Sequence, residues 1–335
     1  MWIWHIKDFK RLDKTNLFLT HFLKFKNYTI SSDNMKKIII IFCLIILVPY
    51  IIVTLFVNIN TQKFYFIKDV NVRIKRNENI VEVPLEEYII GVVSAEMPAS
   101  FNIEALKAQA VAARSYVLTK MEQNKDLEYD VVDTVSHQVY LNEEELKNKW
   151  QNNYEEYSTK VKEAVLDTKG EILTYDGEVI EAFFFSTSSG YTENCEEVFM
   201  EALPYLRSVD SHYDEISPAY NSSVMMSLSD FYANLGLPYN EELNVEVVST
   251  TSTGRIKQIK INGNIFTGNQ MTSKLKLKST FFNIERNENN ITINTKGYGH
   301  GVGMSQYGAN GMAQVGYTYD SILKHYYSGV EIIKI

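Results

Sequence analysis

One carboxylate in the sequence lies among apolar neighbours that change its chemistry. Glu96 belongs to the stretch SAEMPAS, residues 94–100, where Ala95, Met97 and Pro98 surround it. Desolvation by such neighbours raises the pKa of a carboxyl group, and a raised pKa suits a general acid near neutral pH. A helix cap or an ion-pair partner is the other interpretation of a lone glutamate, and the residues alone leave both open.

Two cations follow on a predicted helix that is otherwise nearly all alanine and aliphatic. Lys107 and Arg114 are seven residues apart, so on a helix they point within about 20° of one direction. Such a helix is expected to be largely buried, and unpaired charges are costly to bury. The two cations therefore either pair with internal carboxylates or line a cleft that holds a polar ligand.

Several elements must fold to position these residues. Alternating apolar and polar residues on both sides of 77–79 predict a β-hairpin that ends at Pro84. The alanine-rich helix is expected to span 102–123, with an asparagine as its N-cap. A polar stretch over 143–162 predicts an exposed helix that continues to Gly170 as its C-cap.

The later part of the chain carries further hairpin signals. Asp176-Gly177 between two β-rich runs predicts a type I′ turn, and a second hairpin is expected to turn near Thr253-Gly254. A last strand is expected over 290–301 and a short helix over 318–329, closed by Gly329. These elements indicate an α+β fold with mixed, mainly antiparallel sheets, a buried alanine-rich helix and a substrate cleft.

The composition narrows the class of protein. The chain has 335 residues, 45% of them hydrophobic, which predicts one or two domains with a sizeable core. Its 33 basic and 41 acidic residues, with no concentrated basic run in the globular part, argue against nucleic-acid binding. Two cysteines are too few for a disulfide framework or a cysteine-based zinc site.

An uncharged apolar run over 38–57 predicts one transmembrane helix, because its length matches a bilayer core of about 30 Å. Lys36 and Lys37 precede the run, so residues 1–37 are expected in the cytoplasm, 58–69 as a linker and 70–335 as an extracytoplasmic domain. A cleaved signal peptide is the alternative. The run is too long for one and lacks a small-residue cleavage site.

The start of the chain invites a separate hypothesis. The letters MKK at 35–37 stand directly before the apolar run, as is common at the start of such anchors. Met35 is therefore the expected natural start, and residues 1–34 an upstream misreading. N-terminal sequencing that found Met1 or Trp2 would refute this.

Three long segments resemble, in the same order, the stage II sporulation protein D family. They are VPLEEYIIGVVSAEMPASFNIEALKAQAVAARSYVL at 83–118, FFFSTSSGYTENCEEVF at 183–199 and GYGHGVGMSQYGANGMAQVGYTYDSILKHYYSGVEI at 297–332. The resemblance extends from about Val70 to the C-terminus, which is nearly everything outside the predicted anchor. The order of three long motifs makes it specific.

The resemblance implies a peptidoglycan lytic transglycosylase with Glu96 as its catalytic residue. It also implicates Lys107 and Arg114 in activity or substrate contact. In this chemistry one carboxylate protonates the oxygen between N-acetylmuramic acid and N-acetylglucosamine and then accepts a proton from the muramic 6-hydroxyl, which leaves a 1,6-anhydro end. No second carboxylate is required, unlike in most glycosidases. Glu193 is the next candidate for the acid.

Two polar motifs are the expected substrate contacts. The stretch STSSGY at 186–191 offers hydroxyl groups, and GYGHGVGMSQYG at 297–308 offers polar side chains among glycines that permit close backbone approach. Structural roles, as a polar loop after a strand or as supports of tight turns, are the alternatives. The second motif lacks the Gly-Lys-Ser/Thr ending of a phosphate-binding loop, and the first is not a Gly-x-Ser-x-Gly elbow. The predicted substrate-binding residues here are Ser186, Ser188, Tyr191, His300, Ser305 and Gln306.

No metal and no cofactor are predicted. Some relatives carry a Cys/His zinc cluster before a QVY motif, whereas this chain has only His137 in that region. A zinc site needs at least three protein ligands, so His137 is expected to be structural. Phe184 also stands where relatives often carry histidine, which argues against a side-chain role there.

The resemblance also implies location and partners. It predicts a membrane-bound protein of the engulfing mother cell that acts on glycan strands with stage II sporulation proteins M and P. The latter is an amidase that strips the stem peptides, so that denuded glycan becomes the substrate. The alternative is a non-catalytic glycan-binding scaffold that stimulates a cell-wall amidase.

Overall fold

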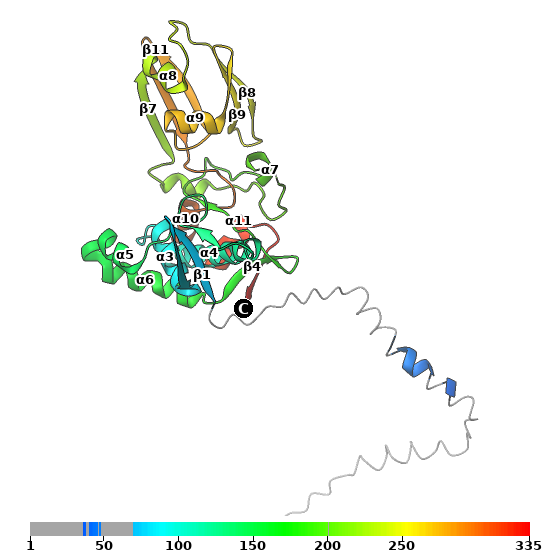
Figure 1. Ribbon diagram of the computed structural model, residues 1–335. Helices are drawn as coiled ribbons and strands as arrows, with labels where there is room; N and C mark the ends of the chain where they lie inside the picture. The colour runs from blue at the N-terminus through cyan, green and yellow to red at the C-terminus, as the bar shows by residue number, and fades with distance from the viewer. Residues whose placement is uncertain (1–35, 38–39, 46, 48–69, 200) are drawn as a thin grey trace, which may run out of the picture. The chain divides into compact units, whose positions relative to one another are not determined.

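The computed structural model describes residues 36–37, 40–45, 47, 70–199 and 201–335, and the chain divides into units 1–61 and 62–335 (Figure 1). The described residues of the first unit are helical and exposed. No helix in the described part of the chain is both long and apolar enough to cross a membrane. Most of the predicted span at 38–57 lies outside the described residues, as do the linker and the two candidate start residues.

The second unit opens with the predicted hairpin. Strand β1 (Asn71–Arg76) pairs antiparallel with β2 (Asn79–Pro84), and Asn77 takes a positive φ of 54° in the turn. The short strand β3 (Val131–Val132) adds to β1 in parallel. Helix α3 (Leu85–Glu96) starts directly after Pro84, which ends β2 and is the N-cap of the helix. The hairpin prediction is confirmed.

Helix α4 (Ile103–Gln123) is the centre of the first hydrophobic core. The Asn102 side chain accepts a hydrogen bond from the backbone N–H of Glu104, which confirms the predicted cap. Nearly every residue from Ala105 to Val117 is buried. The elements packed around it are α3, β4 (Glu171–Tyr175), α6 (Tyr154–Asp167), α10 (Gln306–Gln314) and α11 (Tyr319–Tyr326). Small alanine side chains permit this close packing on all sides.

The helix predicted from residue 143 to Gly170 is interrupted. The structure has α5 (Glu143–Trp150), a 3₁₀ turn (Gln151–Asn153) and α6 (Tyr154–Asp167). Gln151 takes a positive φ of 48°, which ends the first helix while Trp150 is buried in the core. Gly170 has a positive φ in the turn before the next strand rather than at the helix cap.

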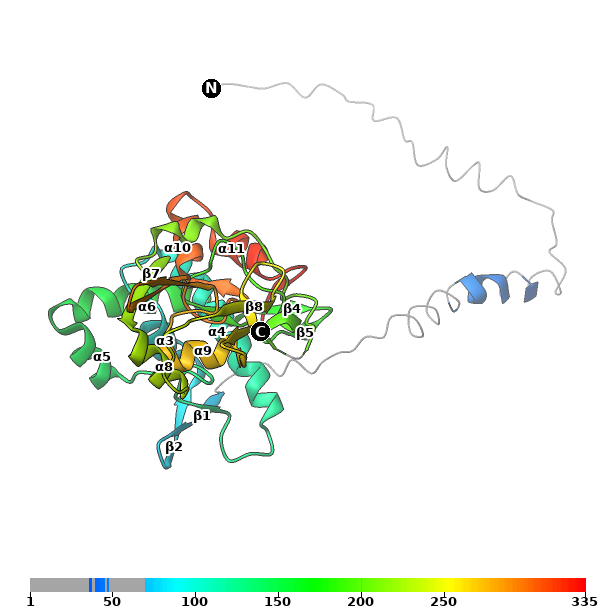
Figure 2. The same cartoon turned by 90° about the horizontal axis from the view of Figure 1, so that it is seen from above.

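The remaining elements of the first core come from the middle and the end of the chain. Strand β4 (Glu171–Tyr175) pairs antiparallel with β5 (Glu178–Val179) and with β14 (Glu331–Lys334). The turn between β4 and β5 lies at Asp176-Gly177, as predicted. Helix α11 (Tyr319–Tyr326) is also where the sequence predicts it, and Figure 2 gives a second view of these elements.

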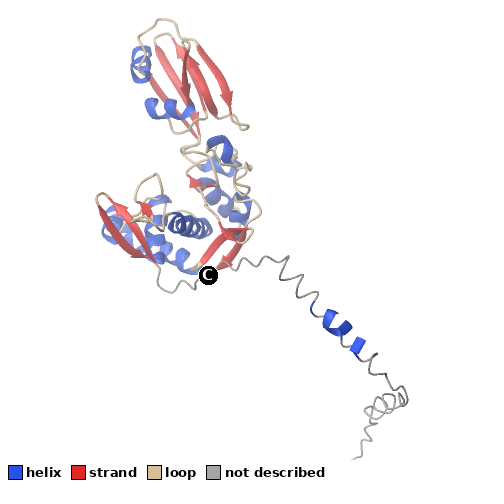
Figure 3. Cartoon of the chain, turned by 45° about the vertical axis from the view of Figure 1, so that its right-hand side comes forward, coloured by secondary structure: helices blue, strands red, loops and turns tan. Residues whose placement is uncertain are grey.

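Residues 221–296 form an insertion with a hydrophobic core of its own. One sheet has the order β11 (Phe282–Asn287), β12 (Asn290–Lys296), β7 (Asn221–Ser227), and another has the order β10 (Asn264–Thr267), β9 (Ile256–Ile261), β8 (Val245–Thr250). Helices α8 (Leu228–Leu235) and α9 (Gly268–Leu275) complete it (Figure 3). Both sheets are antiparallel, so the predicted α+β class with mainly antiparallel pairing is confirmed.

Two motifs that are far apart in the sequence meet next to this insertion. Strand β6 (Phe184–Phe185) pairs in parallel with β13 (Met304–Ser305), and single bridges join Thr187 to Tyr298 and Glu193 to Val302. Helix α10 (Gln306–Gln314) follows β13 directly. The strand predicted over 290–301 ends at Lys296, and residues 297–303 lie in bends and single bridges with positive φ at their glycines. Only the end of the glycine-rich stretch becomes strand and helix. Two short helical segments, α7 (Cys195–Val198) and the 3₁₀ turn His212–Ile216, lie in the connection.

Candidate active site

Glu96 is the last residue of α3, and its carboxyl group is half-buried. Its Oε1 accepts a hydrogen bond of 2.8 Å from the backbone N–H of Val139. Burial raises the pKa of Glu96, while the Val139 bond and the charge of Lys149 oppose that rise. The result is a carboxyl group that is partly open to solvent and holds its proton to higher pH than an ordinary glutamate. This is the environment that the sequence predicts.

Arg114 has partners that explain its burial. The side chain is 0% exposed, and its Nε and Nη2 donate to the two carboxylate oxygens of Glu86 at 3.0 and 2.7 Å. A third bond of 2.9 Å joins Nη1 to the backbone carbonyl of Glu171. The structure thus has the internal ion pair, one of the two alternatives that the sequence leaves open. The guanidinium links α3, α4 and the start of β4.

Lys107 is also paired, but nearer the surface. Its Nζ lies 3.2 Å from a carboxylate oxygen of Glu104 and 2.9 Å from one of Asp167. Neither Lys107 nor Arg114 bonds to Glu96 in the described part of the chain. A substrate contact by either cation stays a prediction, and for Arg114 it would require the Glu86 pair to open.

Asp214 accepts a hydrogen bond from one hydroxyl group of each polar motif. This buried carboxylate accepts hydrogen bonds from the hydroxyls of Ser188, Ser211 and Ser305 and from the backbone N–H of Ser188. The Ser211 hydroxyl also bonds to the hydroxyl of Tyr326 at 2.7 Å. Burial raises the pKa of Asp214, and these hydrogen bonds lower it in part. Ser188 and Ser305 therefore hold two segments together, the structural role that the sequence leaves as an alternative.

His300 is held as a neutral ring. The N–H of Val302 donates to Nδ1 at 3.1 Å, so Nε2 carries the proton and donates to the carbonyl of Phe184 at 3.1 Å. Burial, and after it the charge of Arg255, lower the pKa of His300 to about 4, although the bond to Phe184 opposes that change. The ring supports the turn rather than exchanging protons near neutral pH.

The other predicted substrate residues differ in exposure. Ser186 is half-buried beside the hydroxyl of Thr187, and Gln306 is buried with its Nε2 3.4 Å from Oε1 of Gln109. Tyr191 is 54% exposed, so it is the most accessible of the predicted contacts.

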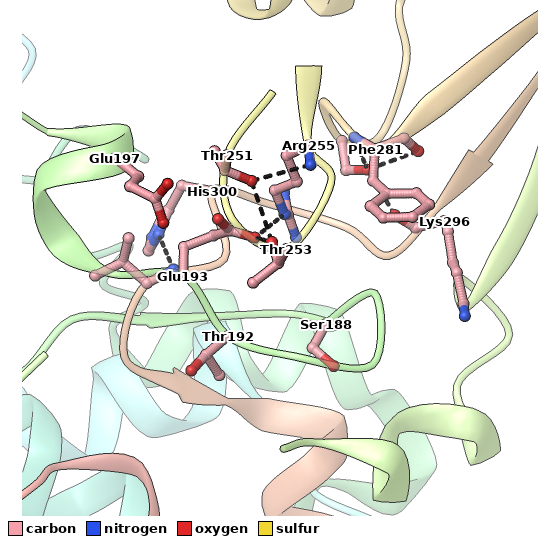
Figure 4. A network of polar contacts seen from close by, with 12 residues as sticks. Ser188, Thr192, Glu193, Glu197, Thr251, Thr253, Arg255, Phe281, Lys296 and His300 are labelled. Carbon is pink, nitrogen blue, oxygen red and sulfur yellow. Dashed lines mark hydrogen bonds and ion pairs between the residues drawn. The ribbon is translucent and has the colours of Figure 1, made fainter. Parts of the chain in front are cut away.

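Glu193, the second candidate for the acid, is fully buried. Figure 4 shows it facing Arg255 of the insertion, with Glu193 Oε1 and Arg255 Nε 3.2 Å apart and Thr253 donating to the same oxygen. Arg255 also donates from Nη1 to the carbonyl of Gly299 at 2.8 Å. Without access to solvent, Glu193 is poorly placed to protonate a glycan, and its evident role is to join the insertion to the first core.

The structure thus separates the predicted site residues into groups. Glu96 lies at the end of α3 near Val139 and Lys149, and the two cations lie in ion pairs along α4. Ser188 and Ser305 meet at Asp214, and His300 bonds to Phe184. Two pockets, of about 570 and 690 Å³, are lined by none of the predicted site residues. The sequence did not indicate roles for Lys149, Asp214, Glu86 and Arg255, because the role of each depends on partners that lie far away in the sequence.

The metal prediction concerns His137. Its Nδ1 accepts a hydrogen bond from the N–H of Val132, as expected for a structural histidine. The described residues contain no group of three or more histidines, cysteines or acids that could hold a metal ion.

Comparison with known proteins identifies the family of the chain. A family model described as SpoIID, stage II sporulation protein, matches residues 74–175, which include Glu96. Stage II sporulation protein D of Bacillus subtilis (strain 168) is 45% identical over 261 residues, and that of Bacillus amyloliquefaciens is 44% identical, with 76% of each chain covered in both cases. The amidase enhancer of Bacillus subtilis (strain 168) is 32% identical in an alignment of 301 positions that covers 72% of this chain and 40% of that protein.

The match thus defines a sporulation protein with an α+β domain. The chain belongs to the stage II sporulation protein D family.

Proposed function

We propose that the chain is a lytic transglycosylase that cleaves the bond between N-acetylmuramic acid and N-acetylglucosamine in denuded glycan strands. The observation that carries this is the carboxyl group of Glu96, which is half-buried, has a raised pKa and accepts one backbone hydrogen bond. Family membership supports the same assignment, because Glu96 lies in the AEMPA segment of the matched range.

One carboxyl group suffices for the whole reaction. Protonated Glu96 gives its proton to the glycosidic oxygen, the bond from that oxygen to the anomeric carbon breaks, and N-acetylglucosamine leaves as an alcohol. The carboxylate then takes the proton of the muramic 6-hydroxyl while that oxygen bonds to the anomeric carbon. The products are a 1,6-anhydro end and a new 4-hydroxyl end, no water is consumed, and Glu96 regains its proton.

The test is the Glu96→Gln variant of the full chain on denuded glycan, with products identified by mass spectrometry. Glutamine has nearly the same shape but cannot deliver or accept a proton, so we expect anhydro products to fall by about 10²-fold or more. Glycan binding should stay within about threefold of wild type, because the substitution leaves the site's shape unchanged. Cleavage by the variant at the wild-type rate would overturn Glu96 as the acid.

A second candidate function is a non-catalytic scaffold that binds glycan and stimulates a cell-wall amidase. The similarity to a protein named amidase enhancer favours it. The same digestion separates the two functions. Tight glycan binding without anhydro products from the wild-type chain, together with faster turnover by an added amidase, would identify the scaffold.

We also propose that the chain is a single-pass membrane protein with residues 70–335 outside the cytoplasm, in the mother-cell membrane that engulfs the spore. Its proposed partners there are stage II sporulation proteins M and P and the peptidoglycan strands. The support is the apolar run at 38–57 with lysines on its N-terminal side. Protease protection in inside-out vesicles tests the orientation, because residues 70–335 should resist digestion there.

A further inference from the structure

Glu96 lies at an electrostatically unfavourable place for a carboxylate. It ends α3, where the last carbonyl groups have no partner within the helix and form the negative end of the helix dipole. Two glutamates occupy the first turn of α3, but its last turn contains no basic residue. A cation that balances this end of the helix would therefore come from another element.

Lys149 of α5 supplies that cation. Its Nζ donates hydrogen bonds to the backbone carbonyls of Ser94 at 2.9 Å and Ala95 at 3.2 Å, which directly precede Glu96. Burial lowers the pKa of Lys149, and the negative charge of Glu96 opposes that effect. The charge of each group therefore shifts the pKa of the other.

The segment that carries Lys149 is fixed to the first sheet. Arg76 of β1 donates to carboxylate oxygens of Asp133 at 2.6 Å and Glu145 at 2.8 Å. The other oxygen of Asp133 accepts from the N–H of Tyr140 at 2.7 Å, and the preceding residue, Val139, donates to Glu96. One segment, 133–150, therefore presents to Glu96 both a hydrogen-bond donor and a positive charge.

The buried tyrosine of α3 and the nearby cations of α4 and α6 that the structure pairs have partners other than Glu96. Tyr88 of α3 is buried, and its hydroxyl donates to the side chain of Gln138. The cations are held elsewhere: Lys107 by Glu104 and Asp167, Arg114 by Glu86, and Lys160 by the carbonyl of Phe101. Lys149 is thus the cation whose charge acts on Glu96 in the described part of the chain.

We propose that Lys149 is a positioning residue for Glu96, which neutralises the end of α3 and stabilises the carboxylate left after proton donation. The inference rests on the proposed function of Glu96 as the acid and base. In the first half of the reaction a negative charge appears on Glu96, and the ammonium group reduces its cost. In the second half the carboxylate regains a proton, and Lys149 keeps its two carbonyl bonds throughout.

The variant Lys149→Met removes the charge while retaining much of the side chain's length, and Lys149→Arg keeps the charge and the donors. Lys147→Met is a matched control, because Lys147 lies on the same exposed helix and pairs with Glu143. All are made in the full chain, and the pH dependence of kcat/KM is measured with denuded glycan. Glu96 acts first as an acid, so its pKa sets the alkaline limb of that profile.

Loss of the Lys149 charge should raise the pKa of Glu96 further. We expect the alkaline limb of Lys149→Met to move up by about 0.5 to 1 pH unit. Turnover should fall about threefold to tenfold, since one pKa unit is a tenfold change in the proton-release equilibrium. Lys149→Arg and Lys147→Met should retain the wild-type limb. A general loosening of α5 would lower the rate without moving the limb upward, and that outcome would overturn the inference.

A second measurement does not depend on activity. Carbon-13 NMR of the chain labelled at the glutamate carboxyl carbon, with the Glu96 signal identified by its loss in Glu96→Gln, reports the pKa directly. It should rise in Lys149→Met and stay within about 0.2 units in Lys147→Met. Equal values in wild type and Lys149→Met would refute the role of Lys149. A wild-type chain that makes no anhydro product refutes the proposed function instead, whatever the NMR titration gives.

Discussion

At the scale of single residues, burial distinguishes a charged group that is bonded within the protein from one that can reach a substrate. Arg114 is 0% exposed and has a bidentate partner in Glu86, so its bonds are saturated within the protein. Glu96 is half-buried with one backbone donor, so part of its carboxyl group remains open. Only the second arrangement suits a group that must reach a substrate. We therefore expect substitution of Arg114 to lower stability and substitution of Glu96 to lower cleavage.

The Arg114→Met variant should lose about 3 to 5 kcal/mol of unfolding free energy, because Glu86 is left without its buried partner. Lys107→Met is the control on the same helix. Its partly exposed pairs with Glu104 and Asp167 should contribute less than about 1 kcal/mol. Urea unfolding of the full chain in detergent measures both. An Arg114→Met protein of unchanged stability with weakened glycan binding would instead make Arg114 a substrate residue.

At the scale of elements, Asp214 joins three segments that no local pattern connects. It receives hydroxyl groups from the segment after β6, from its own 3₁₀ turn and from the N-cap of α10. Helix α10 must approach closely for this. A Cβ atom at Gly308 would lie 2.0 Å from the Tyr326 hydroxyl and 2.7 Å from Asp214. The glycines of this stretch are thus explained by close packing of a helix as well as by turns.

The Asp214→Asn variant tests this role. An amide keeps one acceptor but turns its NH₂ group toward hydroxyl donors, so at least one buried hydroxyl loses its partner. We expect a loss of about 2 to 3 kcal/mol in urea unfolding. Asp210→Asn, at an exposed carboxylate four residues away, should cost less than about 1 kcal/mol. Equal stability of the Asp214→Asn and wild-type proteins would mean that the hydroxyl groups find other partners.

At the scale of the whole second unit, a buried charge pair joins two hydrophobic cores. Glu193 belongs to the first part and Arg255 to the insertion, and both side chains are almost completely inaccessible. Arg255 Nη2 and Glu193 Oε2 have no hydrogen-bond partner, so the pair is only partly satisfied. Burial lowers the pKa of Arg255, and the charge of Glu193 opposes this. Removing one partner would leave the other charge uncompensated.

A double-mutant cycle measures the pair. Arg255→Met alone should cost about 3 to 5 kcal/mol, whereas Arg255→Met with Glu193→Leu should recover much of that loss, because neither charge remains buried. Lys260→Met, which breaks an exposed pair with Glu246 in the same insertion, is the matched control and should cost less than about 1 kcal/mol. Strictly additive losses in the double variant would show that the two charges do not stabilise each other.

The sequence by itself determined the local elements and the family. The cap at Asn102, the turn at Asp176-Gly177 and the hairpin after Asn71 follow from neighbours within a few residues, so they are legible without a structure. The order of three long motifs was enough to indicate the family, and the apolar setting of Glu96 was visible in its neighbours. The break at Gln151 was not visible, because no glycine or proline marks the positive φ there.

Only the tertiary structure decided which polar groups are partners. Arg114 bonds to Glu86 across 28 residues, Ser188 to Asp214 across 26, and Lys149 to Ser94 across 55. The family resemblance implicated Arg114 in activity or substrate contact, and the polar motifs suggested Ser188 and Ser305, whereas packing places the bonds of all three inside the protein. Lys149 went unnoticed on a charged, exposed helix. A hydrogen bond depends on distances of about 3 Å, and for residues so far apart in the chain those distances are set by the packing of whole elements.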